Sequence, residues 1–293
     1  MSLIIRGIGL LPRSWIKAVS SLQWRHPLAK KAFDAVSNRL RYRDGVIQQG
    51  VGKGLRFNAG ASAAGQMLGT TEPGLQRAFD LFVQPGMTVF DVGANVGFYS
   101  TISARLVGPA GRVFAFEPLP ENVRMIAHNA NLNTFRHISI QEIALGKENG
   151  HAKFVVSSNP NWGKLASVGA PASVVGEQDV RVACLDTLIR EGTVPRPDLM
   201  KIDVEGAEVD VLEGAADTLS TARPVLFIDL HSTNEPIARL LEHHRYEARV
   251  LGGARAKLTE AVWYAEVIAV PRERTDLFAH LERMASWSLS ASA

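Results

Sequence analysis

The stretch VFDVGANVGFY, residues 89–99, decides the fold. An apolar run rich in β-forming residues ends in Asp91, a turn with two glycines follows, and the run 98–106 is compatible with a helix. Gly93 lets the backbone turn without a clash at Cβ, and Gly97 lets the new helix pack close to the strand. The stretch therefore predicts a strand, a tight loop and a helix, with free helix-terminal amides above the strand end.

A loop of this kind is typical of a site for a nucleotide-like cofactor. A dinucleotide site carries three glycines in the pattern GxGxxG, whereas this loop has two, with Asn95 between them. A carboxylate at the strand tip, here Asp91, would repel a pyrophosphate but suits a ligand that carries an ammonium and a sulfonium group. The loop thus favours S-adenosylmethionine over NAD, and an ordinary βα turn is the alternative interpretation.

Length and composition limit the class of protein. A chain of 293 residues suits one large domain, or one domain with an extension, and 46% hydrophobic with 21% charged residues is ordinary for a soluble protein. The single cysteine, Cys184, excludes an internal disulfide and a CxxC metal site. No apolar run is long enough to span a bilayer, and Arg6 interrupts the start too early for a secretory signal. We therefore expect a cytoplasmic protein.

The charge is unevenly distributed. Residues 1–56 hold eleven Lys and Arg against two Asp and Glu, a net charge of +9, and the remainder has a net charge of −6. Residues 1–43 read as basic and helical, which fits either packing on the body or peripheral contact with the inner membrane surface. No aromatic and basic motif supports nucleic-acid binding. The predicted domains are a basic N-terminal helical extension, 1–70, and a main domain, 71–293.

Two further acidic residues follow predicted strands. Residues 112–117 form a second strand that ends in Glu117, about 20 residues past the glycine loop, where a carboxylate meets ribose hydroxyls in a βαβ nucleotide site. Residues 138–146 read as a third strand with a turn, which places Glu142 near the same edge. Glu142 could accept a hydrogen bond from an adenine amine, or could simply be solvated.

The stretch LMKIDVEGAE, residues 199–208, is the second informative one. A strand ends near Asp203 and a helix follows, with its apolar face running from Val209 to Leu219. Ligands of open parallel sheets bind at the carboxyl ends of the strands. The acids expected at such ends are Asp91, Glu117, Asp203 and Asp229. Helix capping could explain Glu205 or Glu208, but it does not explain four acids at four strand ends.

The other predicted elements complete an alternating α/β pattern with one interruption. Strands are expected at 152–156, 180–184, 224–231, 246–251 and 263–270, and helices at 72–83, from Pro118 onward, at 235–243 and at 273–287. Residues 157–178, rich in Ser, Asn, Gly and Pro, read as a long loop. Such loops often act as lids, and Trp162 within it could stack on an acceptor ring or anchor the loop.

Four of these segments, in this order, resemble the FkbM-type methyltransferases. They are DVGANVGFYS from Asp91, Phe116-Glu117-Pro118, Ala144-Leu145-Gly146 and KIDVEGAE from Lys201. The resemblance covers about residues 86–231. It implies a Rossmann-like, doubly wound α/β fold whose seven-stranded sheet is mostly parallel, with the last strand antiparallel. It also implies methyl transfer from S-adenosylmethionine to a hydroxyl, often on a sugar, glycan or polyketide.

The resemblance also implies roles for individual residues. The loop 91–97 would hold the methionine part of the cofactor, Glu117 the ribose, and Glu142 with Ala144 the adenine, while Asp203 and Glu205 would border the methyl group. The family often has a glutamate where this chain has Asp229. The cofactor contacts predicted in this way are Asp91, Gly93, Ala94, Asn95, Gly97, Phe98, Glu117, Pro118, Glu142, Ala144, Asp203 and Glu205.

Methyl transfer to an alcohol needs a base that takes its proton. Asp203 and His231 are the predicted catalytic residues, His231 for its intrinsic pKa and Asp203 for its position. Asp203, Glu205 and Asp229 could hold magnesium, but the spacing does not demand it, so no metal is predicted. A nicotinamide-dependent oxidoreductase and a non-catalytic scaffold of the same fold are the alternatives. The sequence does not specify the acceptor or the oligomeric state.

Overall fold

The computed structural model describes residues 41–62, 64–157, 164–169, 174–251, 257–261, 264–277, 279–280 and 282–283. The predicted basic helix falls almost entirely outside them, as does Trp162. Cytoplasmic location and peripheral membrane contact therefore stay predictions. Within the described ranges, no helix combines the length and the apolarity needed to cross a lipid bilayer.

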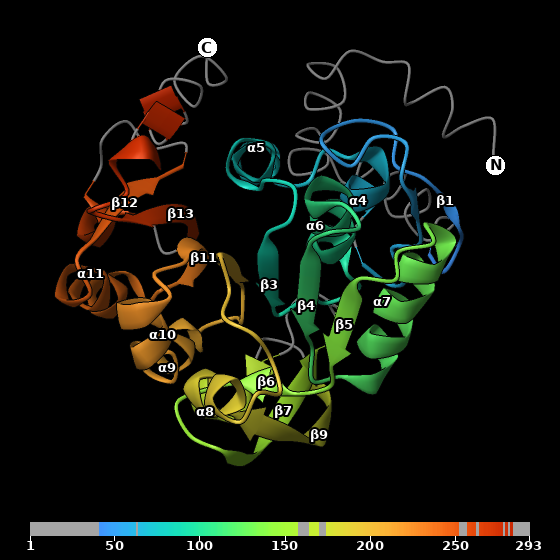
Figure 1. Cartoon of the computed structure of the whole chain (residues 1–293). Helices are drawn as coiled ribbons and strands as arrows, with labels where there is room; N and C mark the ends of the chain where they lie inside the picture. Colours follow the sequence, from blue (N-terminus) through green and yellow to red (C-terminus); the bar gives the residue numbers. More distant parts are fainter. Residues whose placement is uncertain are drawn as a thin grey trace, which may run out of the picture.

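A seven-stranded sheet forms the centre of the molecule (Figure 1), in the order β12-β13-β11-β10-β3-β4-β5. Its strands are β3 (Thr88–Val92), β4 (Arg112–Phe116), β5 (Ile138–Gln141), β10 (Leu199–Ile202), β11 (Val225–His231), β12 (Tyr246–Val250) and β13 (Tyr264–Pro271). β13 pairs antiparallel with both neighbours, and the other pairings are parallel. The predicted doubly wound α/β sheet with one antiparallel strand is confirmed.

Helices cover both faces of this sheet, which gives three layers. One face carries α5 (Pro73–Phe82), α6 (Phe98–Val107) and α7 (Pro120–Leu132), and the other α8 (Leu185–Arg190), α9 (Glu208–Glu213), α10 (Ala216–Thr221) and α11 (Asn234–His243). The strands alternate between the two cores. In β3, for example, Val89 packs in the core beneath α5 and α6, whereas Phe90 and Val92 pack in the core beneath α8 to α11. Burial on both sides explains the continuous apolar runs in the sequence.

A smaller sheet, inserted after β5, lies across the lower part of Figure 1. Its strands, in the order β6-β9-β7-β8, are β6 (Ala144–Leu145), β7 (Gly150–Ser157), β8 (Lys164–Leu165) and β9 (Val174–Ala183). The prediction of one strand with a turn over 138–146 was wrong in its second half, because Ala144 pairs with Val182 of the small sheet. Glu142 lies between the two sheets and is exposed.

The prediction of a long loop over 157–178 was also wrong in part. This stretch contains β8, a 3-10 turn at Ala166–Val168 and the first residues of β9. The β7–β9 ladder extends through Val156 opposite Gly176 and, after a register shift, to Ser157 opposite Val174. Because the stabilising partner of β9 is remote in sequence, local Ser, Gly and Pro content gave no sign of it.

Other elements differ in detail from the predicted ones. The expected single helix from Val209 to Leu219 is divided into α9 and α10. A Cβ on Gly214, between them, would lie 2.1 Å from the carbonyl oxygen of Gly146, so a long-range backbone contact accompanies the break. Where the helix 273–287 was expected, the structure has a 3-10 turn at Thr275–Leu277 and then helical residues at 279–280 and 282–283, and much of the remainder lies outside the described residues. Helix α8 was not predicted.

Residues 41–70, the predicted end of the N-terminal extension, contain β1 (Gly45–Val46), β2 (Arg56–Phe57) and α4 (Ala64–Leu68). Ile47, Leu55 and Phe57 enter the core beneath α5 and α6. The buried Asn129 of α7 accepts a hydrogen bond from the backbone of Asn58 at 2.7 Å and returns one to its carbonyl at 2.9 Å. This segment therefore packs tightly on the main domain.

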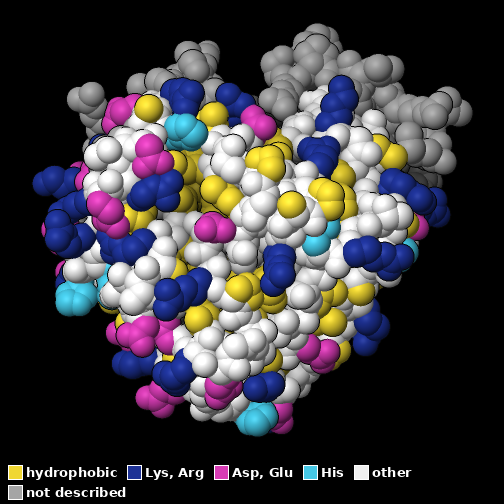
Figure 2. All heavy atoms as spheres, in the orientation of Figure 1, with side chains coloured by type: hydrophobic (Ala, Val, Ile, Leu, Met, Phe, Trp, Pro, Cys, Tyr) yellow, Lys and Arg dark blue, Asp and Glu magenta, His cyan; other side chains and the backbone are white. Residues whose placement is uncertain are grey.

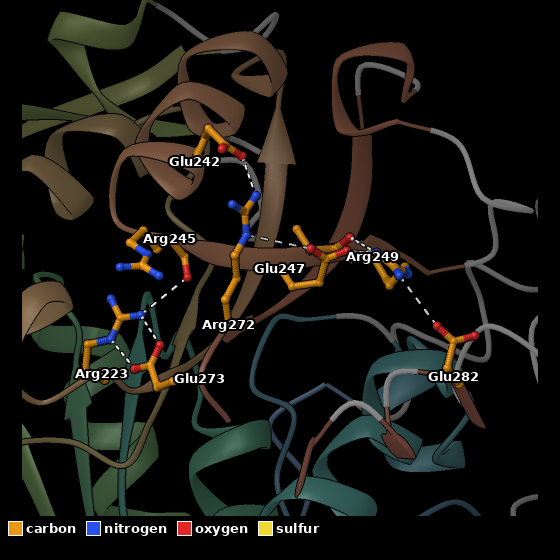
Figure 3. A network of polar contacts seen from close by, with 9 residues as sticks. Arg223, Glu242, Arg245, Glu247, Arg249, Arg272, Glu273 and Glu282 are labelled. Atoms are coloured by element: carbon orange, nitrogen blue, oxygen red, sulfur yellow. Dashed lines mark hydrogen bonds and ion pairs between the residues drawn. The ribbon is translucent and has the colours of Figure 1, made fainter. Parts of the chain in front are cut away.

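An ion-pair network links the elements around β12 and β13 (Figure 3). Arg223 binds Glu273 with a shortest distance of 2.6 Å and donates to the backbone carbonyls of His244 and Arg245. Arg272 pairs with Glu242 of α11 at 2.5 Å. Exposed pairs contribute little stability individually, so we interpret the network chiefly as fixing the antiparallel edge of the sheet.

Candidate active site

The loop after β3 lies against the end of β10. The backbone amides of Gly93 and Ala94 both donate to the carbonyl oxygen of Phe116 at 3.0 Å. Gly93 has a φ of 77°, and a Cβ there would lie 1.8 Å from the carbonyl oxygen of Asp203. Only glycine meets both conditions, so the first glycine of the loop lets three strand ends converge. Gly97, with a φ of 82°, begins α6 close to Ile126 of α7.

Glu117 is held between this loop and the start of α7. Its buried carboxylate accepts hydrogen bonds from the backbone amides of Asn95 at 2.9 Å and Leu119 at 3.0 Å, and from Asn122 Nδ2 at 3.1 Å. Burial raises the pKa of Glu117 to about 7, although these hydrogen bonds oppose the shift. The predicted ribose residue is thus a rigidly held carboxylate beside the glycine loop, with Pro118 between it and α7.

A buried lysine, which the sequence interpretation missed, joins two of the predicted strand-end acids. Lys201 lies directly opposite Asp91 in the β10–β3 ladder. Its Nζ is 3.0 Å from Asp203 Oδ2 and 4.0 Å from Asp91 Oδ1. Burial lowers the pKa of Lys201, but the attraction of Asp203 and Asp91 outweighs this and raises it overall. A lone lysine inside the apolar run LMKI was the signal that could have revealed it.

Asp91 itself is almost completely buried, at 1% exposure. Its Oδ2 accepts a hydrogen bond from Ser100 Oγ of α6 at 2.6 Å, and burial raises its pKa. Its Oδ1 has no hydrogen-bond partner among the described residues. Asp91 therefore fixes the strand tip to α6 and to Lys201, beneath the glycine loop.

Asp229 lies deeper in the sheet than predicted, at 2% exposure. Neither of its carboxylate oxygens has a hydrogen-bond partner among the described residues. Burial, then the charges of Asp203 and Glu72, raise its pKa well above the usual range. Opposite it on β13 is Glu266, whose pKa is raised to about 8, chiefly by burial. Burial thus raises the pKa of both members of this cross-strand pair.

His231, at the end of β11, is held by glutamates of the β10–α9 segment. Its Nδ1 is 3.0 Å from Oε1 of Glu208, and its Nε2 is 3.5 Å from Oε2 of Glu205. Glu208 is fully buried and also accepts hydrogen bonds from the Gly206 amide and Thr233 Oγ1, both at 2.8 Å. Burial lowers the pKa of His231, but the two glutamates outweigh it and raise the pKa overall.

One group of side chains here has the geometry of a metal site. Asp203, Glu205 and His231 each offer one ligand atom, and these atoms all lie within 4.8 Å of one another. Asp229, which the sequence suggested as a third ligand, is not in this group, and His231 takes its place. Burial and the neighbouring Asp203 and Glu208 raise the pKa of Glu205 to about 7, against the attraction of His231.

The small sheet lies against this part of the site. Leu165 of β8 and Val180 of β9 form a buried cluster with Ala207, just before α9. Val168 lies so close to Gly206 that a Cβ there would come within 2.7 Å of it. On the face drawn in Figure 2, charges of both signs are interspersed, mostly around the rim, and apolar side chains gather nearer the middle. The small sheet and the adjoining Val168 therefore pack against residues 204–207, the segment that carries Glu205.

The structure thus brings together the loop 93–97, Asp91, Glu117 and Asp203, with Glu205 and His231 adjacent. Ala94 and Phe98 are buried within or just after the loop. Glu142 and Ala144 lie beyond the end of β5, at the start of the inserted sheet. The contacts of all these residues with a cofactor remain predictions.

The sequence of this chain is similar to those of known methyltransferases. The family model "Methyltransferase FkbM domain" matches residues 91–283. The chain is 27% identical over 165 residues to the hexuronic acid methyltransferase AglP of Haloferax volcanii, which covers 55% of this chain and 64% of that protein. It is 26% identical over 156 residues to the 2-O-methyltransferase NoeI of Sinorhizobium fredii, covering 49% of this chain and 63% of that protein. The chain therefore matches less than two thirds of the length of either relative.

Among solved structures, the methyltransferase FkbM from Methylobacillus flagellatus aligns with a TM-score of 0.43 at 18% identity. The alignment covers 63% of this chain and 43% of that one.

Proposed function

The chain belongs to the FkbM family of S-adenosylmethionine-dependent methyltransferases, and on that premise we propose that it methylates a hydroxyl of a sugar, glycan or related natural-product acceptor. One observation carries the proposal. A glycine loop, a rigid carboxylate and a lysine-bound carboxylate converge at the ends of three adjacent parallel strands, where ligands of such sheets bind.

The proposed cofactor position follows from this arrangement. The loop 93–97 would hold the methionine part, with Asp91 beneath it supplying negative charge for the ammonium and sulfonium groups. Glu117 would accept hydrogen bonds from the ribose hydroxyls, because its carboxylate is already oriented by three donors. Glu142 and Ala144 would flank the adenine beyond β5. The methyl group would then face Asp203 and Glu205.

The reaction is an in-line displacement. The acceptor oxygen attacks the methyl carbon, the carbon–sulfur bond breaks, sulfur keeps the electron pair, and the hydroxyl proton passes to a base. Asp203 and His231 are the candidate bases. Lys201 donates to Asp203, and Glu208 orients His231, so both side chains have defined positions beside the proposed methyl group.

The names of the two relatives support a sugar hydroxyl as acceptor, since one is a hexuronic acid methyltransferase and the other is a 2-O-methyltransferase. Family membership decides against the nicotinamide-dependent oxidoreductase that the sequence left open. The other alternative, a non-catalytic protein that keeps the methyltransferase fold, is distinguished by the following experiment.

The test measures transfer of a radiolabelled methyl group from S-adenosylmethionine to a panel of neutral sugars, aminosugars and hexuronic acids. We expect transfer to at least one of them and a loss of turnover of more than tenfold in Asp203→Asn or His231→Ala. A loss below tenfold in both variants, with cofactor binding intact, would remove both residues from the role of base. Cofactor binding without transfer to any hydroxylated acceptor would favour the scaffold.

A further inference from the structure

We propose that Asp203, Glu205 and His231 form a binding site for a divalent first-row transition-metal ion, of which Mn²⁺ is the test case. The three residues come from two separate segments, the loop after β10 and the end of β11. Their ligand atoms nevertheless lie within 4.8 Å of one another. The proposal goes beyond methyl transfer, because it adds an ion to the site and gives both candidate bases a different task.

The distances suit an ion between the side chains. Ligands about 2.1 Å from a metal lie roughly 3.0 Å apart in an octahedral site and roughly 3.4 Å apart in a tetrahedral one. His231 Nε2 and Glu205 Oε2 are 3.5 Å apart, which is close to the second value. Lys201 binds Oδ2 of Asp203, so Oδ1 is the oxygen that would bind the ion.

The orientation of His231 is an independent observation. Histidines that bind metals almost always use their other ring nitrogen to donate to a carboxylate or carbonyl, which fixes the tautomer. Here Nδ1 lies 3.0 Å from Glu208 Oε1, and Glu208 has no exposed surface. Glu208 is itself fixed by two further donors, the Gly206 amide and Thr233 Oγ1. With an ion bound, Nδ1 would carry the proton donated to Glu208, and Nε2, 3.5 Å from Glu205 Oε2, would bind the ion.

The surrounding charge also favours a cation. Asp229 lies two residues before His231 on the same strand, so both side chains are on the same face of the sheet. Its carboxylate is 2% exposed, and both oxygens are without a hydrogen-bond partner among the described residues. Lys201 is the buried cation shared by Asp91 and Asp203. A divalent ion would offset the excess of carboxylates around it.

The ligand set selects the kind of ion. Calcium and magnesium prefer oxygen ligands alone, whereas an imidazole nitrogen beside two carboxylates suits manganese, iron or zinc. Three protein ligands leave coordination positions for water or an acceptor hydroxyl. This role, which rests on the proposed function, is to orient the hydroxyl and lower its pKa. Asp203 and His231 would then act as ligands, and the released proton would pass to water.

The experiment titrates the full-length protein, first freed of metal by a chelator, with Mn²⁺ alone, and follows free Mn²⁺ by electron paramagnetic resonance. We expect one saturable site with a dissociation constant below about 1 mM, and at least tenfold weaker binding in Asp203→Asn, Glu205→Gln and His231→Asn. Glu191→Gln and His151→Asn, which change exposed residues elsewhere, should bind as the wild type does. Zn²⁺ should displace Mn²⁺ more effectively than Mg²⁺ does.

Circular dichroism and thermal unfolding show which variants are folded, and only folded variants are compared. Two folded variants of the three are enough to test the site. The proposal is overturned if the wild type shows no saturable site, or if folded variants bind Mn²⁺ like the controls. Calorimetry with S-adenosylmethionine separates this result from the proposed function. Binding of Mn²⁺ without binding of S-adenosylmethionine would support the metal site and contradict the proposed methyl transfer. Binding of S-adenosylmethionine without binding of Mn²⁺ would support the proposed methyl transfer and overturn the metal site.

Discussion

At the scale of single residues, the buried carboxylates of Asp91 and Glu117 are the groups that we propose to bind the cofactor. Glu117 illustrates why such a residue is both costly and useful. Three donors orient its carboxylate, yet burial raises its pKa to about 7 in the cofactor-free protein. An unfolded glutamate titrates near 4.5, so the folded state binds this proton more tightly. The contribution of Glu117 to stability therefore falls as pH rises from about 4.5 through 7.

Cofactor binding should show the opposite pH dependence at this residue. Ribose hydroxyls donate to the ionised carboxylate, so we expect affinity for S-adenosylmethionine to weaken as pH drops from 8 to 6, by up to about tenfold per unit below 7. Glu117→Gln should bind about ten- to a hundredfold more weakly at pH 8, since hydrogen bonds to a charged group contribute about 1.5–3 kcal/mol. Calorimetry at three pH values measures both effects.

The exposed Glu191 provides the matched control for that series. Glu191→Gln should retain the wild-type affinity and its pH dependence, whereas in Glu117→Gln the dependence should flatten. An unchanged pH profile in Glu117→Gln would show that another group controls cofactor affinity.

At the scale of elements, the site depends on the close approach of the loop after β3 to the end of β10. This contact forces glycine at position 93, both for its φ of 77° and for the carbonyl oxygen 1.8 Å from a would-be Cβ. Gly192 has a similar φ of 73°, but no atom of the described residues lies within 4 Å of its would-be Cβ. Comparing substitutions at Gly93 and Gly192 therefore separates two contributions to the loss of stability. One is the strain of a left-handed backbone, and the other is the clash between the loop and the end of β10.

We therefore expect Gly192→Ala to lower the free energy of unfolding by about 1–2 kcal/mol, the cost of a left-handed conformation. Gly93→Ala should lower it by clearly more, because the chain must also move away from Asp203. Urea denaturation of both variants, with cofactor affinity measured on the folded protein, gives the comparison. Equal losses of stability would mean that the contact at Asp203 adjusts freely.

The same scale shows which features the sequence could predict. The ends of β3, β4 and β10 were predictable because apolar runs, glycine spacing and acids are local signals. The small sheet was only partly predictable, since β9 depends on pairing with β7 and β6. The interruption between α9 and α10 accompanies a backbone contact of Gly214 with Gly146, 68 positions away, which no local pattern encodes.

The residues that orient the candidate bases were harder to predict than the bases themselves. Asp203 and His231 stand out by residue type and by their positions at strand ends. Lys201 and Glu208 could have been read as a strand lysine and a helix-capping acid. Their roles follow from burial and from contacts across strands, with Lys201 opposite Asp91 and Glu208 against His231.

At the scale of the whole molecule, the two cores meet at a sheet that has a charged layer at its carboxyl edge. Lys201 is the buried cation of this layer, 3% exposed, within 4.0 Å of two carboxylates. Breaking a buried pair by removing one partner commonly costs about 3–5 kcal/mol, because the remaining charge has lost its compensation. The integrity of the fold and the charge of the site are therefore linked.

Lys201→Met should accordingly lower the free energy of unfolding by about 3–5 kcal/mol near pH 8. The loss should shrink toward pH 5, because without Lys201 the pKa of the buried Asp91 rises further and its protonation removes the uncompensated charge. Urea denaturation at both pH values tests this, with the exposed Lys153→Met as control. An equal loss at both pH values would indicate a packing defect instead of an electrostatic one.

The most direct test of the central claim is a calorimetric titration of the purified chain with S-adenosylmethionine, repeated with Asp91→Asn. The account predicts one site with a dissociation constant in the range of about 1–100 µM, the scale of ordinary enzyme–substrate affinities, and binding at least tenfold weaker in the folded variant. A well-folded wild-type protein that takes up no S-adenosylmethionine at millimolar concentration would contradict the account.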